Sequence, residues 1–330
     1  MKTLVGIALA IGAFGWWFFP RAVLRVPSHA APQVKISIHP RSDTKSVAGL
    51  LAAHGIIDSV SGYLLYSIFD SSTQHPRSGT YAVSQGMSYR RIARMFAIGP
   101  EREEISIKII EGWTLDDEAK ALKEYNVDSL LFHNIARVDS WKNDFSFLLT
   151  LSNKTSLEGY LFPDTYRAWK DQLPRSIIKK QLDAFALHAP RLVEEAKKQG
   201  RTLHDIVILA SIVEKEVAQP KDRPIVAGIF WNRLRDGMPL QSDATITYIT
   251  KSGRTRSTLV DLASDSPFNT YRNTGLPPGP ISNPGEDALD AALHPAVTPY
   301  RYFLTDAKGK IYFAQTLDEH ILNRRRAFGE

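Results

Sequence analysis

The sequence contains no cysteine, and this absence removes several kinds of chemistry at once. Without a thiol there is no disulfide framework, no thiolate nucleophile and no cysteine-based metal site. The nine histidines are scattered, with no pair at helical ligand spacing and no HExxH-type motif, so metal catalysis is not expected. A Gly-x-Ser-x-Gly elbow and a phosphate-binding loop are also missing from the sequence. We therefore expect neither a nucleophilic triad nor a cofactor.

The composition is that of a globular protein. The chain has 330 residues, of which 43% are hydrophobic and 23% are charged, enough for two or three modest domains with cores of their own. The net charge of +6 is a mild excess, compatible with an anionic polymer or a membrane surface nearby. The basic helix ends lack interleaved aromatic residues, so we expect no nucleic-acid partner.

The N-terminal end is the most apolar part of the chain. Residues 3–19 carry no charge and end in an aromatic cluster, which indicates a single membrane anchor over residues 1–20. The alternative is a cleaved signal peptide, but Arg21 and Arg25 follow the apolar run directly and argue against it. Residues 21–33 are rich in proline and small residues and are interpreted as a linker.

A small module is expected over residues 34–100. Alternating apolar residues predict strands at 34–38 and 79–83, and apolar spacing predicts helices at 46–53, 63–69 and 89–98. This order of strand, helix, helix, strand and helix is typical of a compact α/β module.

Two acidic residues close a strongly apolar segment further along the chain. Apolar residues recur at three- and four-residue steps from Leu203 to Val217, which predicts an amphipathic helix packed on a core. Glu214 and Glu216 lie about 200° apart around its axis, and both have apolar neighbours. Apolar walls raise the pKa of a carboxyl group, as a general acid near neutral pH requires. The helical wheel does not choose between the two glutamates, and either could instead be solvated or paired with a residue such as Arg223.

The segments that follow bring further polar groups. A second helix is predicted to run from Pro224 to Gly237, and Asp243 is placed to cap a short helix that presents Thr245 and Tyr248. The loop 158–166 combines aromatic and acidic residues, which suits a carbohydrate site, although a Pro-Asp turn with packed aromatics explains it equally well. Residues 275–285 are dense in proline and glycine, as the rigid wall of a cleft requires.

These segments together resemble the endolytic murein transglycosylase family, also called MltG or YceG-like. The match lies in residues 210–216, 226–234, 240–243, 158–166 and 275–285. It is similar in order, spacing and residue type, extends over about residues 34–328 and is strongest from 203 to 304. The resemblance implies an α+β chain with three parts: an N-terminal membrane helix, a LysM-like module at 34–100, and a larger mixed α+β YceG-like catalytic domain at 101–330. The module could also be a simple spacer, because fold does not fix function.

The resemblance also implies a reaction and a catalytic residue. In the family one glutamate, the second of a Glu-Lys-Glu pair, protonates the bond between MurNAc and GlcNAc; in this chain it is Glu216. The same group then acts as a base while the muramoyl C6 hydroxyl closes an anhydro ring, so the enzyme is a lyase. The other expected site residues, as substrate contacts or supports, are Glu214, Gln241, Asp243, Thr245, Tyr248, Asn269, Asn283, Glu158 and Asp164.

Location and partners follow from the same resemblance. We expect a single-pass protein of the inner (plasma) membrane whose catalytic part lies outside, cutting within nascent peptidoglycan strands and ending their elongation. Cell-wall synthases are its candidate protein partners. The competing hypotheses are a non-catalytic cell-wall-binding scaffold and a muramidase that hydrolyses the same bond.

Overall fold

A computed structural model describes residues 32–70, 73, 76–251 and 258–329. The predicted anchor at residues 1–20 and nearly all of the predicted linker lie outside these residues. Within the described ranges, no helix combines the length and the apolar character needed to span a membrane. The chain divides into two compact units, and the boundary falls between Arg102 and Glu103.

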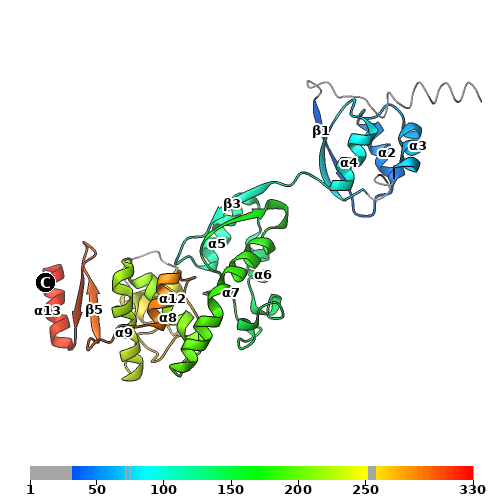
Figure 1. Cartoon of the computed structure of the whole chain (residues 1–330). Helices are drawn as coiled ribbons and strands as arrows, with labels where there is room; N and C mark the ends of the chain where they lie inside the picture. Colours follow the sequence, from blue (N-terminus) through cyan, green and yellow to red (C-terminus); the bar gives the residue numbers. More distant parts are fainter. Residues whose placement is uncertain (1–31, 71–72, 74–75, 252–257, 330) are drawn as a thin grey trace, which may run out of the picture. The chain divides into compact units, whose positions relative to one another are not determined.

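The first unit is a two-stranded sheet covered by helices (Figure 1). Strands β1 (Gln33–Ile38) and β2 (Gly79–Ser84) pair antiparallel. The helices are α2 (Thr44–Ala53), α3 (Val60–Phe69) and α4 (Tyr89–Ile98). Ile36 and Ile38 alternate with exposed residues along β1, so both enter the core. The predicted order of strands and helices is confirmed, whereas the kinship to LysM modules stays a prediction.

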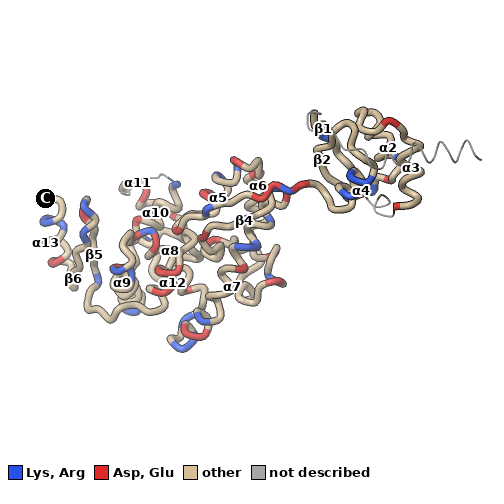
Figure 2. The backbone as a smooth tube through the Cα atoms, turned by 45° about the horizontal axis from the view of Figure 1, so that its top comes forward, with Lys and Arg blue, Asp and Glu red and all other residues tan. Residues whose placement is uncertain are grey.

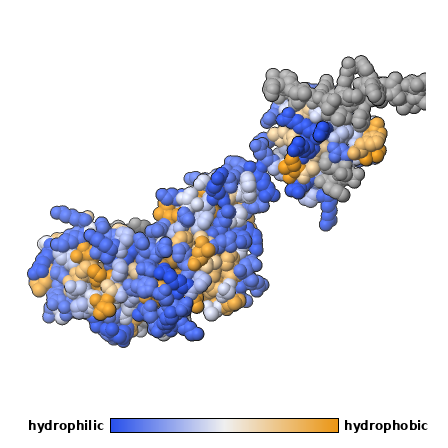
Figure 3. Space-filling view, viewed as in Figure 1, coloured by the Kyte–Doolittle hydropathy of each residue, from blue (hydrophilic) through white to orange (hydrophobic). Residues whose placement is uncertain are grey.

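The surface of the first unit is both basic and apolar. Helix α4 exposes Arg90, Arg91 and Arg94, which form part of the blue stretch on this helix in Figure 2. Figure 3 shows an apolar patch on the same unit, and α3 exposes the apolar side chains of Ile68 and Phe69. In the second unit, acidic and basic residues are interspersed along the chain (Figure 2).

In its described residues, the second unit is mainly helical and contains two small sheets. Strands β3 (Glu104–Lys108) and β4 (Thr165–Trp169) pair antiparallel, as do β5 (Tyr302–Thr305) and β6 (Ile311–Ala314). The α-helices are α5 (Leu115–Leu122), α6 (Ser129–Ile135), α7 (Arg175–Lys198), α8 (Leu203–Glu216), α9 (Arg223–Arg235), α10 (Asp243–Thr250), α11 (Leu259–Leu262), α12 (Glu286–Leu293) and α13 (Leu317–Phe328). The predicted mixed α+β character is confirmed.

Helix α8 lies at the centre of this unit. It starts with a capping box in which Thr202 and Asp205 each bond the backbone N–H of the other. Every residue of 206–213 is buried, because α7, α9, α10 and α12 pack around the helix. The predicted amphipathic pattern is therefore wrong for the middle of α8. Burial contributes about 1.5–3 kcal/mol for each large apolar side chain, so packing on every side fixes where the C-terminal end of α8 lies.

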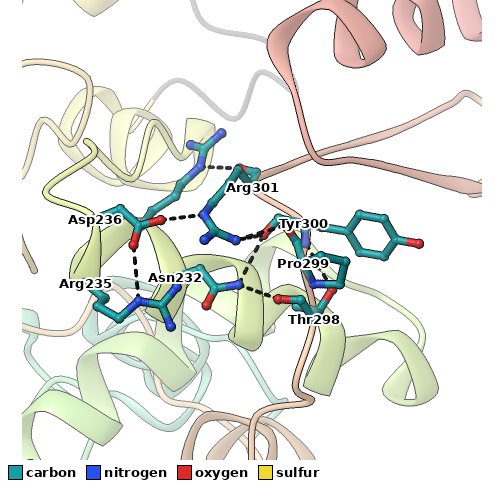
Figure 4. A network of polar contacts seen from close by, with 8 residues as sticks. Asn232, Arg235, Asp236, Thr298, Pro299, Tyr300 and Arg301 are labelled. Carbon is teal, nitrogen blue, oxygen red and sulfur yellow. Dashed lines mark hydrogen bonds and ion pairs between the residues drawn. The ribbon is translucent and has the colours of Figure 1, made fainter.

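Helix α9 holds the C-terminal part of the chain by polar contacts (Figure 4). Asn232 Nδ2 donates to the carbonyl oxygens of Thr298 at 2.8 Å and Tyr300 at 3.2 Å. Arg301 Nε donates to the carboxylate of Asp236 at 2.5 Å. These bonds anchor the segment that leads into β5, and α13 packs on the β5–β6 hairpin.

Candidate active site

Glu216 is the last residue of α8 and reaches the start of another helix. Its Oε1 accepts a hydrogen bond from Ser242 Oγ at 2.5 Å and one from the backbone N–H of Ala244 at 3.3 Å. Ser242 comes just before α10, and Ala244 lies in its first turn, where backbone N–H groups have no partner within the helix. In the part of the chain that the structure describes, no residue donates a hydrogen bond to Oε2. Oε2 also does not belong to the polar atoms that are buried without a partner. The carboxyl group is thus held by one oxygen and open at the other.

The surroundings of Glu216 favour its neutral form. Burial raises the pKa of this carboxyl group above its usual value, against the lowering effect of the bonds from Ser242 and Ala244. The negative charge of Asp243 raises the pKa further, and the positive charge of Arg233 lowers it. A largely buried carboxyl group with a raised pKa keeps its proton nearer to neutral pH, so it is equipped to act as a general acid.

Glu214 lies in a different environment, as the helical geometry predicts. Its Oε1 forms an ion pair with Arg223 Nη2 at 2.5 Å, and its Oε2 accepts the backbone N–H of Gly285 at 3.0 Å. Both side chains of the pair are 5% exposed. Burial raises the pKa of Glu214, while the Gly285 N–H and Arg223 lower it. Because both oxygens bond within the protein, Glu214 joins α8 to α9 and to the start of α12.

The cap of α10 differs from the prediction. Ser242, and not Asp243, is the N-cap residue, because it has extended backbone angles while Asp243 is already the first residue of the helix. The Ser242 hydroxyl makes no capping bond to α10 and donates to Glu216 instead. Sequence reasoning missed this residue: Ser is a common N-cap, but nothing local indicates that its hydroxyl would reach another helix.

The loop before α10 is fixed by Thr270. Its carbonyl oxygen accepts the N–H of Gln241 at 3.0 Å, and its Oγ1 accepts the N–H of Ser242 at 3.0 Å. Thr245 Oγ1 lies 2.9 Å from the same hydroxyl and is fully buried. Gln241 has a φ of 49° and an exposed side chain. Of the residues predicted here, Gln241 is therefore accessible, and Thr245 supports the loop from inside.

Asp243 and Asn269 are held by the neighbouring loop. Tyr271 donates from its hydroxyl to Asp243 Oδ1 at 3.0 Å. Asn269 is fully buried; its Nδ2 donates to the carbonyl oxygens of Leu262 and Ser264, and its Oδ1 accepts the N–H of Tyr271. Asn269 thus positions Tyr271, which in turn contacts the partly buried Asp243.

Asn283 connects three segments far apart in the sequence. Its Oδ1 accepts the backbone N–H groups of Gly159 at 2.7 Å and Leu161 at 3.3 Å. Its Nδ2 donates to Glu118 Oε1 at 2.9 Å, and both side chains are fully buried. Burial raises the pKa of Glu118 to about 8. Sequence reasoning missed Glu118, which stands beside two exposed acidic residues in the first turn of α5 and gives no sign of burial.

The remaining predicted residues divide between a pocket and the surface. Glu158 is 5% exposed and lines a pocket of about 380 Å³ together with Tyr248. Asp164 is exposed at the start of β4, and its Oδ1 accepts the N–H of Thr165 at 2.6 Å. The structure therefore brings Gln241, Asp243 and Glu216 together, but it leaves Asp164 outside both this group and the pocket lining.

These features define a site with one available carboxyl group at the end of a buried helix, braced by the cap of a second helix. The chain belongs to the YceG-like family, whose model matches residues 36–326. The predicted family is thus confirmed.

Relatives and a solved structure agree with this assignment. The chain is 32% identical over 320 residues to the endolytic murein transglycosylase of Bacillus subtilis (strain 168), covering 93% of this chain and 88% of the relative. It is 29% identical over 352 residues to that of Streptococcus pneumoniae serotype 2 (strain D39 / NCTC 7466), covering 98% of this chain and 64% of the relative. The crystal structure of a yceG-like protein from Listeria monocytogenes matches with a TM-score of 0.60 and 31% identity, over 89% of this chain and 100% of the other.

Proposed function

We propose that this protein is an endolytic lytic transglycosylase of peptidoglycan, which breaks the MurNAc–GlcNAc bond within glycan strands and leaves 1,6-anhydro-MurNAc ends. Two kinds of support combine here. The curated relatives are named endolytic murein transglycosylase, and Glu216 has the surroundings that a single acid–base group needs. The observation that carries the proposal is the asymmetry of its carboxyl group, with Oε1 held by Ser242 and Oε2 open.

The chemistry needs no second carboxyl group and no water. Neutral Glu216 donates its proton from Oε2 to the glycosidic oxygen as the bond from that oxygen to C1 of MurNAc breaks. The resulting carboxylate then takes the proton of the C6 hydroxyl while the C6 oxygen bonds to C1. Glu216 ends protonated as it began, and the two products together contain the atoms of the substrate. General acid–base catalysis of this kind typically contributes about 10²–10⁴-fold in rate.

Glu214 is the poorer candidate for this role. A carboxyl group must approach the proton that it transfers to within hydrogen-bond distance. Glu214 is held on both oxygens by Arg223 and Gly285, and its side chain is 5% exposed. We assign it a supporting role, in which it fixes the end of α8 and thereby the backbone of Glu216.

The other predicted residues divide by accessibility. Gln241 is exposed and Asp243 is partly exposed beside Glu216, and we assign both to contact with sugar hydroxyls. Thr245, Asn269 and Asn283 are fully buried with their polar groups bonded inside the protein, so we assign them to supporting the loops. Asp164 keeps no assigned contact.

We further propose that residues 1–20 anchor the protein in the plasma membrane with its catalytic part outside, where it would end the elongation of nascent strands beside the synthases. This part rests on the apolar run at residues 3–19 and on the family. The kinship of the first unit to LysM modules belongs to the same proposal.

The test is cleavage of purified glycan strands by the wild-type protein and by Glu216→Gln. Glutamine keeps the size of the side chain but has no acid proton, so we expect the rate to fall about 10²–10⁴-fold with an unchanged melting temperature. The exposed Glu124 offers a matched control, and Glu124→Gln should cleave normally. Full activity of Glu216→Gln would overturn the assignment. Inactivity of the wild-type protein would favour the scaffold alternative.

A further inference from the structure

A pocket on the second unit is lined by residues of three helices and two loops, and the proposed reaction leaves it unused. Its volume is about 380 Å³, within the range of small-molecule sites. The lining residues are Leu115, Asp116, His133, Ser156, Glu158, Tyr248, Ile249, Lys251, Ser266 and Phe268. They combine a buried acid, two aromatic rings and a set of charged groups.

Helix α10 connects the pocket to the proposed acid. Tyr248 and Ala244 are four residues apart on α10 and therefore share one face of the helix, about 6 Å apart along its axis. Ala244 donates its N–H to Glu216, and Tyr248 lines the pocket. A glycan strand bound against Glu216 along this face would place a neighbouring sugar at the pocket.

The charged groups of the pocket are already paired with one another. Asp116 bonds Lys251 through one carboxylate oxygen and His133 through the other, the latter at 3.1 Å. Neither a cationic nor an anionic ligand therefore finds an uncompensated charge there. The pocket suits a neutral ligand group instead.

The buried part of the pocket offers a polar group next to an apolar wall. Glu158 is 5% exposed; its Oε1 accepts the N–H of Leu115 at 3.0 Å, and its Oε2 lies at a long 3.5 Å from the hydroxyl of Tyr248. The rings of Tyr248 and Phe268 have their centroids 5.3 Å apart. A ligand with a carbonyl group and a small apolar end would use both features.

We propose that this pocket takes the acetamido group of an amino sugar next to the cleaved bond, with its carbonyl oxygen bound by Glu158 and Tyr248 and its methyl group against Phe268. This inference rests on the proposed function, because it supposes a glycan strand at Glu216. It makes N-acetylation of the strand a requirement for good cleavage.

The titration of Glu158 supports the geometry. Burial raises the pKa of Glu158 to about 8. The hydrogen bond from the N–H of Leu115 lowers this pKa, and the negative charges of Glu118 and Asp116 raise it. The other titratable groups that face the pocket are Tyr248, which lowers this pKa, and the paired His133 and Lys251. Glu158 is therefore protonated at neutral pH, and a protonated carboxyl group donates a hydrogen bond.

The experiment compares three strand preparations: native, N-deacetylated, and deacetylated then re-acetylated. We expect the wild-type kcat/KM to fall at least about tenfold on deacetylation, which corresponds to the loss of one hydrogen bond. It should recover on re-acetylation. Glu158→Ala should remove this preference, and Tyr248→Phe should reduce it. Glu158→Gln should keep the preference for acetylated strands, because an amide group also donates a hydrogen bond. This variant should keep the preference above pH 8 as well, where that of the wild-type protein declines. Glu124→Gln, at an exposed position, is the matched control and should behave like the wild-type protein.

A binding measurement separates this inference from the proposed function. Calorimetric titration of the Glu216→Gln protein with N-acetylglucosamine tetrasaccharide and with its deacetylated form needs no cleavage. We expect tighter binding of the acetylated form and loss of the difference on adding Glu158→Ala. Equal binding of both forms would overturn the inference even if cleavage occurs. Tighter binding of the deacetylated form would assign the pocket to amines held by Asp116 and would overturn it as well.

Discussion

At the scale of single residues, the structure separates two glutamates that the sequence leaves equivalent. Both stand at the end of one apolar helix, and the helical wheel only says that their surroundings differ. Their hydrogen-bond partners distinguish them: Glu214 bonds Arg223 and Gly285, whereas Glu216 bonds Ser242, the N-cap of α10. These partners lie 9 to 71 residues away in the sequence, so local patterns do not contain them.

Ser242 provides a prediction at this scale. Its bond to Oε1 favours the ionised form of Glu216 and lowers the pKa of that carboxyl group. Ser242→Ala should therefore raise this pKa and move the alkaline limb of the kcat/KM–pH profile to higher pH. The loss of one positioning bond, about 1.4 kcal/mol, should lower the maximal rate about tenfold. Ser242→Thr keeps the hydroxyl and should restore the wild-type profile. An alkaline limb that moves to lower pH would contradict this role.

At the scale of secondary-structure elements, the sequence predicts more of the fold than of the site. Apolar spacing correctly places α8 and the helices and strands of the first unit. It fails to show that α8 is enclosed, because the spacing records apolar positions and not the number of helices that cover them. It also assigns the cap of α10 to Asp243, since Ser242 and Asp243 are both good capping residues and only backbone angles distinguish them.

The pair of Glu214 and Arg223 yields a prediction for the junction of α8 and α9. Arg223 Nε also donates to the carbonyl oxygen of Val217 at 3.2 Å, just after α8. Removing one member of a buried pair leaves the other uncompensated. We expect Glu214→Gln to lower the free energy of unfolding by about 3 kcal/mol, as measured by urea denaturation. Glu194→Gln, which breaks an exposed pair with Lys198, is the control and should change it by under about 1 kcal/mol. Equal stability of the two variants would contradict this account.

At the scale of the whole molecule, the interior holds acids that a folded protein must keep neutral. Glu118 and Glu158 are both buried, and burial raises the pKa of each to about 8 from a usual 4.5. The burial of Glu118 is not recognisable from the sequence, because the residues that contact it, Gln181 and Asn283, come from distant segments. Between pH 4.5 and about 8 the folded state binds more protons than the unfolded state.

This imbalance makes stability depend on pH. An acid with a raised pKa stabilises the folded state below its unfolded pKa, and this contribution is lost as pH rises through the folded pKa. The melting temperature should therefore fall from pH 5 to pH 8. In Glu118→Gln the fall should be smaller, because the amide does not titrate, and its oxygen still accepts one of the two bonds from Gln181 and Asn283. Thermal unfolding followed by circular dichroism measures both slopes. A variant with the wild-type slope would show that Glu118 does not titrate as described.

The most direct test of the central claim, a single carboxyl group that serves in turn as acid and base, is the mass of the strand ends that the wild-type protein produces. Mass spectrometry of products from purified glycan strands should find 1,6-anhydro-MurNAc ends, lighter by one water than ends formed by hydrolysis. Reducing MurNAc ends would contradict the account, because they require a water molecule as the attacking group.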